Sequence, residues 1–85
     1  GPMNPATIAG LVLYVREGCH LCEQFHLELS VDLGPAVEQL QVRDVDRNVE
    51  LAVRFGLRVP VLELDGAVLC EGVYDGAGVR RALGL

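Results

Sequence analysis

The 85-residue chain has no lysine and no tryptophan, and its seven arginines are outnumbered by twelve acidic residues. The formal net charge is -5. Because nucleic acids and anionic membrane surfaces are bound through clustered cations, this balance argues against either as a partner. The chain also lacks an apolar run near the ~20 residues of a membrane span, and it lacks the pattern of a secretory signal. We therefore expect a cytoplasmic protein.

Cysteine is scarce and odd in number, since Cys19, Cys22 and Cys70 are the only three. An odd count argues against a framework of structural disulfides. In a reducing compartment, two cysteines as close as Cys19 and Cys22 are more often catalytic or metal-binding than structural. This pair is therefore the first candidate for a functional site.

The length of the chain suits one domain and is too short for two. Gly1 and Pro2, ahead of Met3, look like the remnant of a removed tag. We assign residues 1–9 to this remnant and an N-terminal tail, and residues 10–85 to a single domain. The content of hydrophobic residues, 51%, fits a packed globular domain. We expect this domain to be a monomer.

The first half of the domain reads as a strand followed by a helix. Residues 11–15 form a continuously apolar run, typical of a strand that is covered on both faces. From His20 onwards the apolar spacing changes, because Leu21, Phe25 and Leu29 recur every four residues. Gly34 and the proline that follows it should end this helix.

A second strand and helix are predicted next. Residues 37–45 are the second strand candidate, because Leu40 and Val42 alternate with Gln39, Gln41 and Arg43, which favours a strand at the edge of a sheet. Asp46 or Asn48 can cap the helix that follows, because either side chain accepts bonds from free backbone N–H groups. Leu51 and Phe55 are its expected buried pair, and Gly56 stands where a glycine commonly ends a helix.

The last third of the chain predicts a hairpin and a short helix. Two apolar runs, 59–64 and 67–70, are joined by Asp65-Gly66, a strong hairpin signal. Asp75 can cap the final helix. The whole order is β-α-β-α-β-β-α, and right-handed crossovers make the first two strands parallel. We therefore predict an α/β fold with a four-stranded mixed sheet and helices on both faces.

The candidate chemistry lies at Cys19 and Cys22. A cysteine just after a strand and just before a helix meets free backbone N–H groups and the positive end of the helix dipole, which favour the thiolate. Cys22 lies about one turn inside the same helix and can close a small disulfide ring with Cys19. We therefore predict Cys19 as the nucleophile and Cys22 as the resolving thiol. Arg16 and His20 are candidate cations beside the thiolate.

Two alternatives to redox chemistry remain open. The cysteines can be ligands of a metal-binding module, holding zinc or an iron-sulfur cluster shared between subunits. However, Cys70, His20 and His26 do not have the spacing of a second ligand pair, so we predict no metal. In the other alternative, the fold is vestigial and the thiols do nothing. We expect Cys70 to be a small buried hydrophobic residue.

Three segments resemble the glutaredoxin-like branch of the thioredoxin superfamily: residues 13–22, residues 57–62 and residues 72–75. The resemblance extends over nearly the whole chain from Leu11 onwards. It implies a thioredoxin-like fold and an enzyme that reduces protein disulfides or glutathione mixed disulfides. It implies no cofactor other than glutathione as a co-substrate.

The resemblance also implies the position of the substrate. It implies a cis peptide bond between Val59 and Pro60 that faces the dithiol. Gly72 and Asp75 match positions that hold the γ-glutamyl end of glutathione, whereas Glu71 and Tyr74 replace a glycine and an aspartate of that pattern. The expected substrate site therefore consists of Arg16, His20, Leu21, Val59, Pro60, Gly72 and Asp75.

Overall fold

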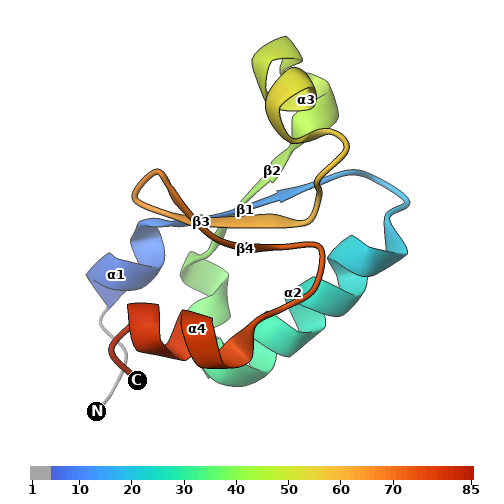
Figure 1. Cartoon of the computed structure of the whole chain (residues 1–85). Coiled ribbons are helices and arrows are strands. Elements are labelled where there is room, and N and C mark those ends of the chain that lie inside the picture. The colour runs from blue at the N-terminus through green and yellow to red at the C-terminus, as the bar shows by residue number, and fades with distance from the viewer. Residues whose placement is uncertain (1–4) are drawn as a thin grey trace.

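The computed structural model, shown in Figure 1, describes residues 5–85 of the chain. The α-helices and strands are, in chain order, α1 (Pro5–Ala9), β1 (Leu11–Val15), α2 (His20–Leu33), β2 (Gln41–Asp44), α3 (Val49–Phe55), β3 (Val61–Leu64), β4 (Ala67–Glu71) and α4 (Gly76–Ala82). Two 3-10 segments, η1 (Gly34–Gln39) and η2 (Val45–Arg47), flank β2.

The four strands form one mixed sheet in the order β2-β1-β3-β4. Strand β1 pairs in parallel with β2, whereas the β1–β3 and β3–β4 pairs are antiparallel. Leu13 lies opposite Val42 on one side and Leu62 on the other. The predicted α/β fold, with its mixed four-stranded sheet and with the second strand at an edge, is confirmed.

Alternation along β1 sends side chains into two separate cores. Leu11 and Leu13 face the layer of α1, α2 and α4, whereas Tyr14 faces α3 (Figure 1). The larger core is built from Ile8, Leu11, Leu13, Phe25, Leu29, Leu33, Leu40, Leu62 and Val79. The smaller core consists of Tyr14, Val45, Phe55 and Val61. Helices therefore cover both faces of the sheet, as predicted.

One carboxylate, that of Glu63, is buried on the α3 side of the sheet. Tyr14 donates a hydrogen bond of 2.9 Å to Glu63 Oε1, and Arg54 Nη2 lies 3.4 Å from Oε2. Buried charges are tolerated when they are paired in this way. Burial, and then the bond to Glu63, raise the pKa of Tyr14.

The second strand begins later than the sequence predicts. Residues 34–39 form η1, and β2 begins only at Gln41. Val37 and Leu40 are three residues apart, which is the period of a 3-10 helix, and Leu40 N–H donates to Val37 O at 3.0 Å. The prediction that the strand starts at residue 37 is therefore wrong, because the alternation of polar and apolar residues begins only at Gln39.

The N-terminal segment also differs from the prediction. The sequence predicts a tail at residues 5–9, but these residues form α1, and the Ile8 side chain is fully buried in the larger core. The packed unit therefore begins before residue 10. The tag remnant predicted at Gly1-Pro2 lies outside the described residues.

The buried stripe of α2 is confirmed at Phe25 and Leu29 and differs from the prediction only at its first residue. Its buried residues are Cys22, Phe25, Leu29 and Leu33. Leu21, which the periodicity placed on this stripe, is 60% exposed. Cys22 therefore faces the interior of the protein, whereas the dipeptide between the two cysteines, in the first turn of α2, is exposed to solvent. Among the described residues, no helix is both long and apolar enough to cross a membrane.

Candidate active site

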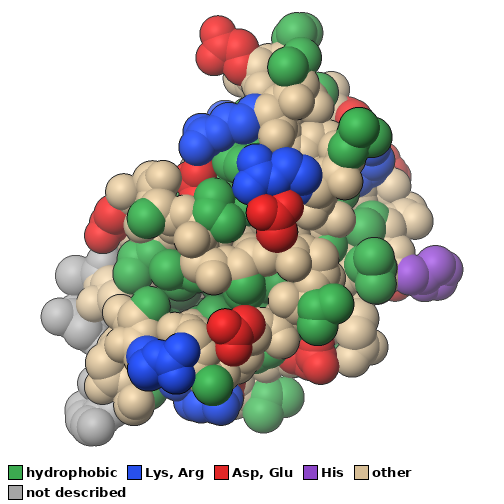
Figure 2. Space-filling view, in the orientation of Figure 1, with side chains coloured by type: hydrophobic (Ala, Val, Ile, Leu, Met, Phe, Trp, Pro, Cys, Tyr) green, Lys and Arg blue, Asp and Glu red, His purple; other side chains and the backbone are tan. Residues whose placement is uncertain are grey.

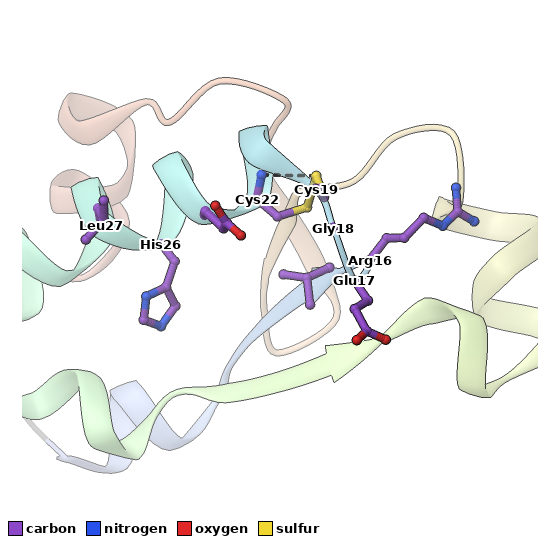
Figure 3. Close-up of a pocket in the computed structure, with 9 residues that line it drawn as sticks. Arg16, Glu17, Gly18, Cys19, Cys22, His26 and Leu27 are labelled. Carbon is purple, nitrogen blue, oxygen red and sulfur yellow. Dashed lines mark hydrogen bonds between the residues drawn. A yellow bond between two sulfur atoms is a disulfide. The ribbon is translucent and has the colours of Figure 1, made fainter.

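Cys19 is the N-cap residue of α2. Its backbone is extended, with φ -95° and ψ 105°, and its Sγ accepts the backbone N–H of Cys22 at 3.1 Å. The sulfur therefore occupies the place of the oxygen in an ordinary helix cap, as Figure 3 shows. Negative charge on this atom is stabilised by the free N–H groups and by the dipole of a 14-residue helix.

Cys19 and Cys22 are joined by a disulfide bond, with a Cα–Cα distance of 5.2 Å. The two sulfurs differ in accessibility, because Cys22 is only 4% exposed and Cys19 is half-buried. The ring predicted from the spacing is confirmed. An external thiol or disulfide reaches Cys19 first, which fits its predicted role as the nucleophile; the two roles themselves stay predictions.

A cavity of about 530 Å³ opens beside the disulfide. Figure 3 shows His26 and Glu17 projecting from its opposite walls, α2 and the loop after β1. The full lining consists of Val15, Arg16, Glu17, Gly18, Cys19, Cys22, Glu23, His26 and Leu27. The cavity is therefore built from one continuous stretch of chain, β1 to the second turn of α2.

Sequence reasoning missed several of these lining residues as site residues. Cys22 and His26 are four positions apart on α2, and so are Glu23 and Leu27, so each pair shares a helix face. This spacing, once Cys22 is taken as the inner thiol, identifies the α2 wall of the cavity. Glu17 carries no comparable signal, because its position depends on the turn after β1.

Arg16 lines the cavity but is directed away from the sulfurs (Figure 3). Its Nε and Nη2 contact the Asp46 carboxylate at 2.9 and 3.0 Å, and its Nη1 donates to the carbonyl of Gly56 at 2.9 Å. The hydrogen bonds to Asp46 raise the pKa of Arg16. The charge of Arg16 is thus neutralised by Asp46, a residue of η2. The sequence instead predicted Arg16 as a cation beside Cys19.

The dipeptide between the cysteines is exposed. His20 is fully exposed at its side chain, and its Nδ1 lies 3.7 Å from Glu23 Oε2. Leu21 is also largely in solvent. Both residues are accessible to a substrate at Cys19, as their predicted role requires; that role stays a prediction.

The residues of the predicted peptide-binding side form a second group. The Val59-Pro60 peptide bond is cis, as the resemblance implied. Pro60 is buried, and its carbonyl accepts the backbone N–H of Gly72 at 2.8 Å. The Asp75 carboxylate accepts the N–H of Gly78 at 3.0 Å and caps α4. None of these residues lines the cavity beside Cys19.

Comparison with known proteins agrees with this geometry. The model of the family described as "Glutaredoxin-like domain (DUF836)" matches residues 10–84. The chain belongs to this family. Among curated proteins, no sequence matches the chain.

Solved structures of similar proteins have the same fold. Protein Ne2328 from Nitrosomonas europaea, solved by NMR, is 36% identical, with a TM-score of 0.75 over 86% of this chain and 88% of that chain. A structural genomics target from X. campestris, solved by X-ray, is 30% identical, with a TM-score of 0.66 over 87% and 95%. Oxidized glutaredoxin 2 from Chlamydomonas reinhardtii is 15% identical, with a TM-score of 0.54 over 94% and 79%. The last likeness shows the fold alone.

In this glutaredoxin-like domain, Glu71 is paired with Arg58. The Arg58 Nε and Nη2 contact the two Glu71 oxygens at 2.7 and 2.8 Å, which is a bidentate arrangement. The bond from Arg58 lowers the pKa of Glu71. The acidic residue that replaces a glycine of the glutaredoxin pattern therefore has its own cation.

The third cysteine of the glutaredoxin-like domain is a free thiol on β4. Cys70 is half-buried and packs against the larger core, close to the predicted environment. Burial raises the pKa of its thiol, and a backbone hydrogen bond at Asp75 opposes this only in part. Burial therefore disfavours the thiolate of Cys70, which is the reactive form of a cysteine.

The described part of this domain contains no cluster of side chains suited to bind a metal ion. Among residues 5–85, no group of three or more His, Cys, Asp and Glu side chains is arranged to hold a metal ion. A cluster shared between two subunits is an alternative to the predicted redox function, and a single chain does not test it.

Proposed function

We propose that this glutaredoxin-like domain is a thiol-disulfide oxidoreductase that uses Cys19 as nucleophile and Cys22 as resolving thiol. One observation carries the proposal. The two sulfurs form a disulfide at the start of α2, where Cys19 is accessible and receives the N–H of Cys22, and where Cys22 is buried. This is the asymmetry that a two-step exchange needs.

The reaction begins from the reduced dithiol. The Cys19 thiolate attacks one sulfur of a substrate disulfide, and the other substrate sulfur leaves as a thiolate and takes up a proton. The Cys22 sulfur, as thiolate, then attacks Cys19 within this mixed disulfide and releases the second substrate thiol. Two electrons pass from the protein to the substrate, and the protein keeps the Cys19–Cys22 disulfide. A dithiol such as dithiothreitol returns it to the reduced state.

The substrates proposed for this reaction are protein disulfides or glutathione mixed disulfides, and no bound cofactor is needed. A reducing compartment such as the cytoplasm would keep the pair ready to react. A monomer suffices, because both sulfurs and the cavity come from one chain.

The test measures disulfide reduction with dithiothreitol as the electron source. We expect Cys19→Ser to reduce the rate to that of buffer alone, since the attacking sulfur is lost. Cys22→Ser should still attack, but it should accumulate a mixed disulfide on Cys19 that mass spectrometry detects. Cys70→Ser is the matched control and should keep the wild-type rate. If Cys19→Ser is as fast as wild type, the proposal is overturned.

A further inference from the structure

The charges at the dithiol end of the molecule are not balanced. Arg16, the arginine that lines the cavity, is neutralised by Asp46. Glu17 and Glu23 line the same cavity, and among residues 5–85 no arginine forms an ion pair with either. Glu23 has only the His20 imidazole, at 3.7 Å. At a pH where imidazoles are neutral, the cavity therefore presents two uncompensated carboxylates to a ligand.

On the other side of the site, the groups capable of holding an anionic ligand already have partners within the protein. Arg58, which precedes Val59-Pro60, has both its Nε and Nη2 on Glu71. The N–H of Gly72 is donated to Pro60, and Asp75 accepts from Gly78. Figure 2 shows arginine and acidic side chains in adjacent positions on the face of the molecule that it displays. A carboxylate of the substrate would have to compete with these internal pairs.

The cavity offers apolar contacts as well as negative charge. Val15 and Leu27 line it, and Leu27 is 63% exposed. Leu21, between the two cysteines in the first turn of α2, is similarly exposed. A side chain next to the substrate cysteine can bury apolar surface here while the exchanging sulfur lies at Cys19.

We propose that this site selects disulfides carried by protein segments with an apolar residue and a positive or uncharged residue beside the cysteine, and that it disfavours glutathione. This inference rests on the oxidoreductase function proposed above. Glutathione carries one more carboxylate than ammonium groups, so like charges oppose its approach to Glu17 and Glu23. A lysine or arginine in the same place is attracted. The occupant of the cavity is thus a cationic, partly apolar segment of a protein substrate.

The size of the effect follows from exposed charge pairs. Each such pair contributes little to binding. Two acting together give a difference of about ten-fold in kcat/KM between substrates of opposite charge at low ionic strength. Salt at about 0.5 M should nearly abolish the difference, because exposed charges are screened.

The experiment compares one cysteine peptide in three versions, flanked by lysine, glutamine or glutamate, with glutathione as the fourth probe. Each is capped as a mixed disulfide with mercaptoethanol and reduced with dithiothreitol at about pH 8, where a cysteine thiol is partly ionised. We expect kcat/KM to fall in the order lysine, glutamine, glutamate, with glutathione near the glutamate peptide. The Glu17→Gln/Glu23→Gln double variant should reduce the lysine-to-glutamate ratio from about ten-fold to about two-fold.

Glu28→Gln is the matched control, because it removes the same charge from α2 at an exposed residue that does not line the cavity. It should leave the ratio unchanged. Equal kcat/KM for the four probes, or preference for glutathione, overturns the inference while the oxidoreductase function stands. Failure of the wild-type protein to exceed the Cys19→Ser variant on every probe overturns the function itself.

A second comparison tests the apolar contact. For wild type, a peptide with leucine beside the cysteine should have a lower KM than one with glycine. Leu27→Ala should reduce this difference in KM, because it removes the exposed apolar wall of the cavity. Val31→Ala is the control, since Val31 is 83% exposed on the same helix and does not line the cavity. If Leu27→Ala and Val31→Ala behave alike, the apolar part of the inference is wrong.

Discussion

Arg16 and Arg58 show how a charged side chain becomes unavailable to a ligand once the fold supplies a partner. Each lies close in sequence to a residue of the predicted site, and each has a carboxylate on two of its nitrogens. Two parallel charge-assisted hydrogen bonds hold such a guanidinium on its carboxylate, so exchange of this partner for a substrate group is unfavourable. At the scale of single residues, the site is therefore defined by its two sulfurs and also by two nearby arginines whose charges are paired within the protein.

Tyr74 is a second residue whose partners determine its behaviour. Its hydroxyl donates to Asp32, and Arg80 Nη1 lies 3.0 Å from both oxygens of the same carboxylate. This cluster joins α2 to α4. Burial, followed by the bond to Asp32, raises the pKa of Tyr74. The folded protein therefore holds the phenolic proton more tightly than the unfolded chain does.

The raised pKa of Tyr74 predicts a loss of stability in alkali. Its contribution is complete below the unfolded pKa of about 10 and is lost as the pH rises above that value, since the unfolded chain releases the proton first. Urea unfolding near pH 8 and near pH 11 should show a smaller loss in Tyr74→Phe than in wild type. Tyr14→Phe is a useful comparison, because the pKa of Tyr14 is also raised. Equal losses in Tyr74→Phe and wild type would contradict the account.

At the scale of elements, two helix starts carry the residues discussed above. Cys19 caps α2 with its sulfur, and Asp75 caps α4 with its carboxylate. A sulfur is a weaker acceptor than a carboxylate, so the cap of α2 is the less stabilising one for the fold and the more useful one for chemistry.

The cap at Asp75 allows its structural role to be separated from its predicted role in binding. Asp75→Ala should lower the free energy of unfolding by about 1 kcal/mol, because the N–H of Gly78 loses its partner. Asp75→Asn retains a capping oxygen and should stay near wild type. Urea unfolding measures both. Turnover of the lysine-flanked peptide by Asp75→Asn should also match wild type; a large loss of turnover at unchanged stability would assign Asp75 to substrate binding instead.

The elements that local sequence signals specify are the ones that sequence predicts well. Asp65 and Gly66 have φ values of 50° and 87°, the left-handed conformation that an Asp-Gly turn favours, and the hairpin lies where it is expected. Residues 37–40 show how an adjoining pattern obscures a short local signal. Val37 and Leu40 are three positions apart, which is the period of a 3-10 turn, whereas the alternation that predicts a strand begins only at Gln39.

At the scale of the whole molecule, the site combines predictable and unpredictable parts. The dithiol and its helix come from adjacent residues, so their spacing reveals them. The pairing of Arg16 with Asp46 joins residues 30 positions apart and depends on where η2 lies. The cis bond before Pro60 was implied by family resemblance, because an ordinary X-Pro bond is cis only ~5–6% of the time. Long-range contacts, which no local pattern encodes, thus account for what the sequence alone does not predict.

The central claim is that the start of α2 makes Cys19 a reactive thiolate. The direct test is the alkylation rate of the fully reduced, folded protein by iodoacetamide at about pH 6.5, with each cysteine followed by mass spectrometry. Cys70 is the internal standard, because burial raises the pKa of its thiol. We expect Cys19 to react at least about ten-fold faster than Cys70, and we expect the two rates to converge in urea. A Cys19 that reacts no faster than Cys70 in the folded protein would contradict the account.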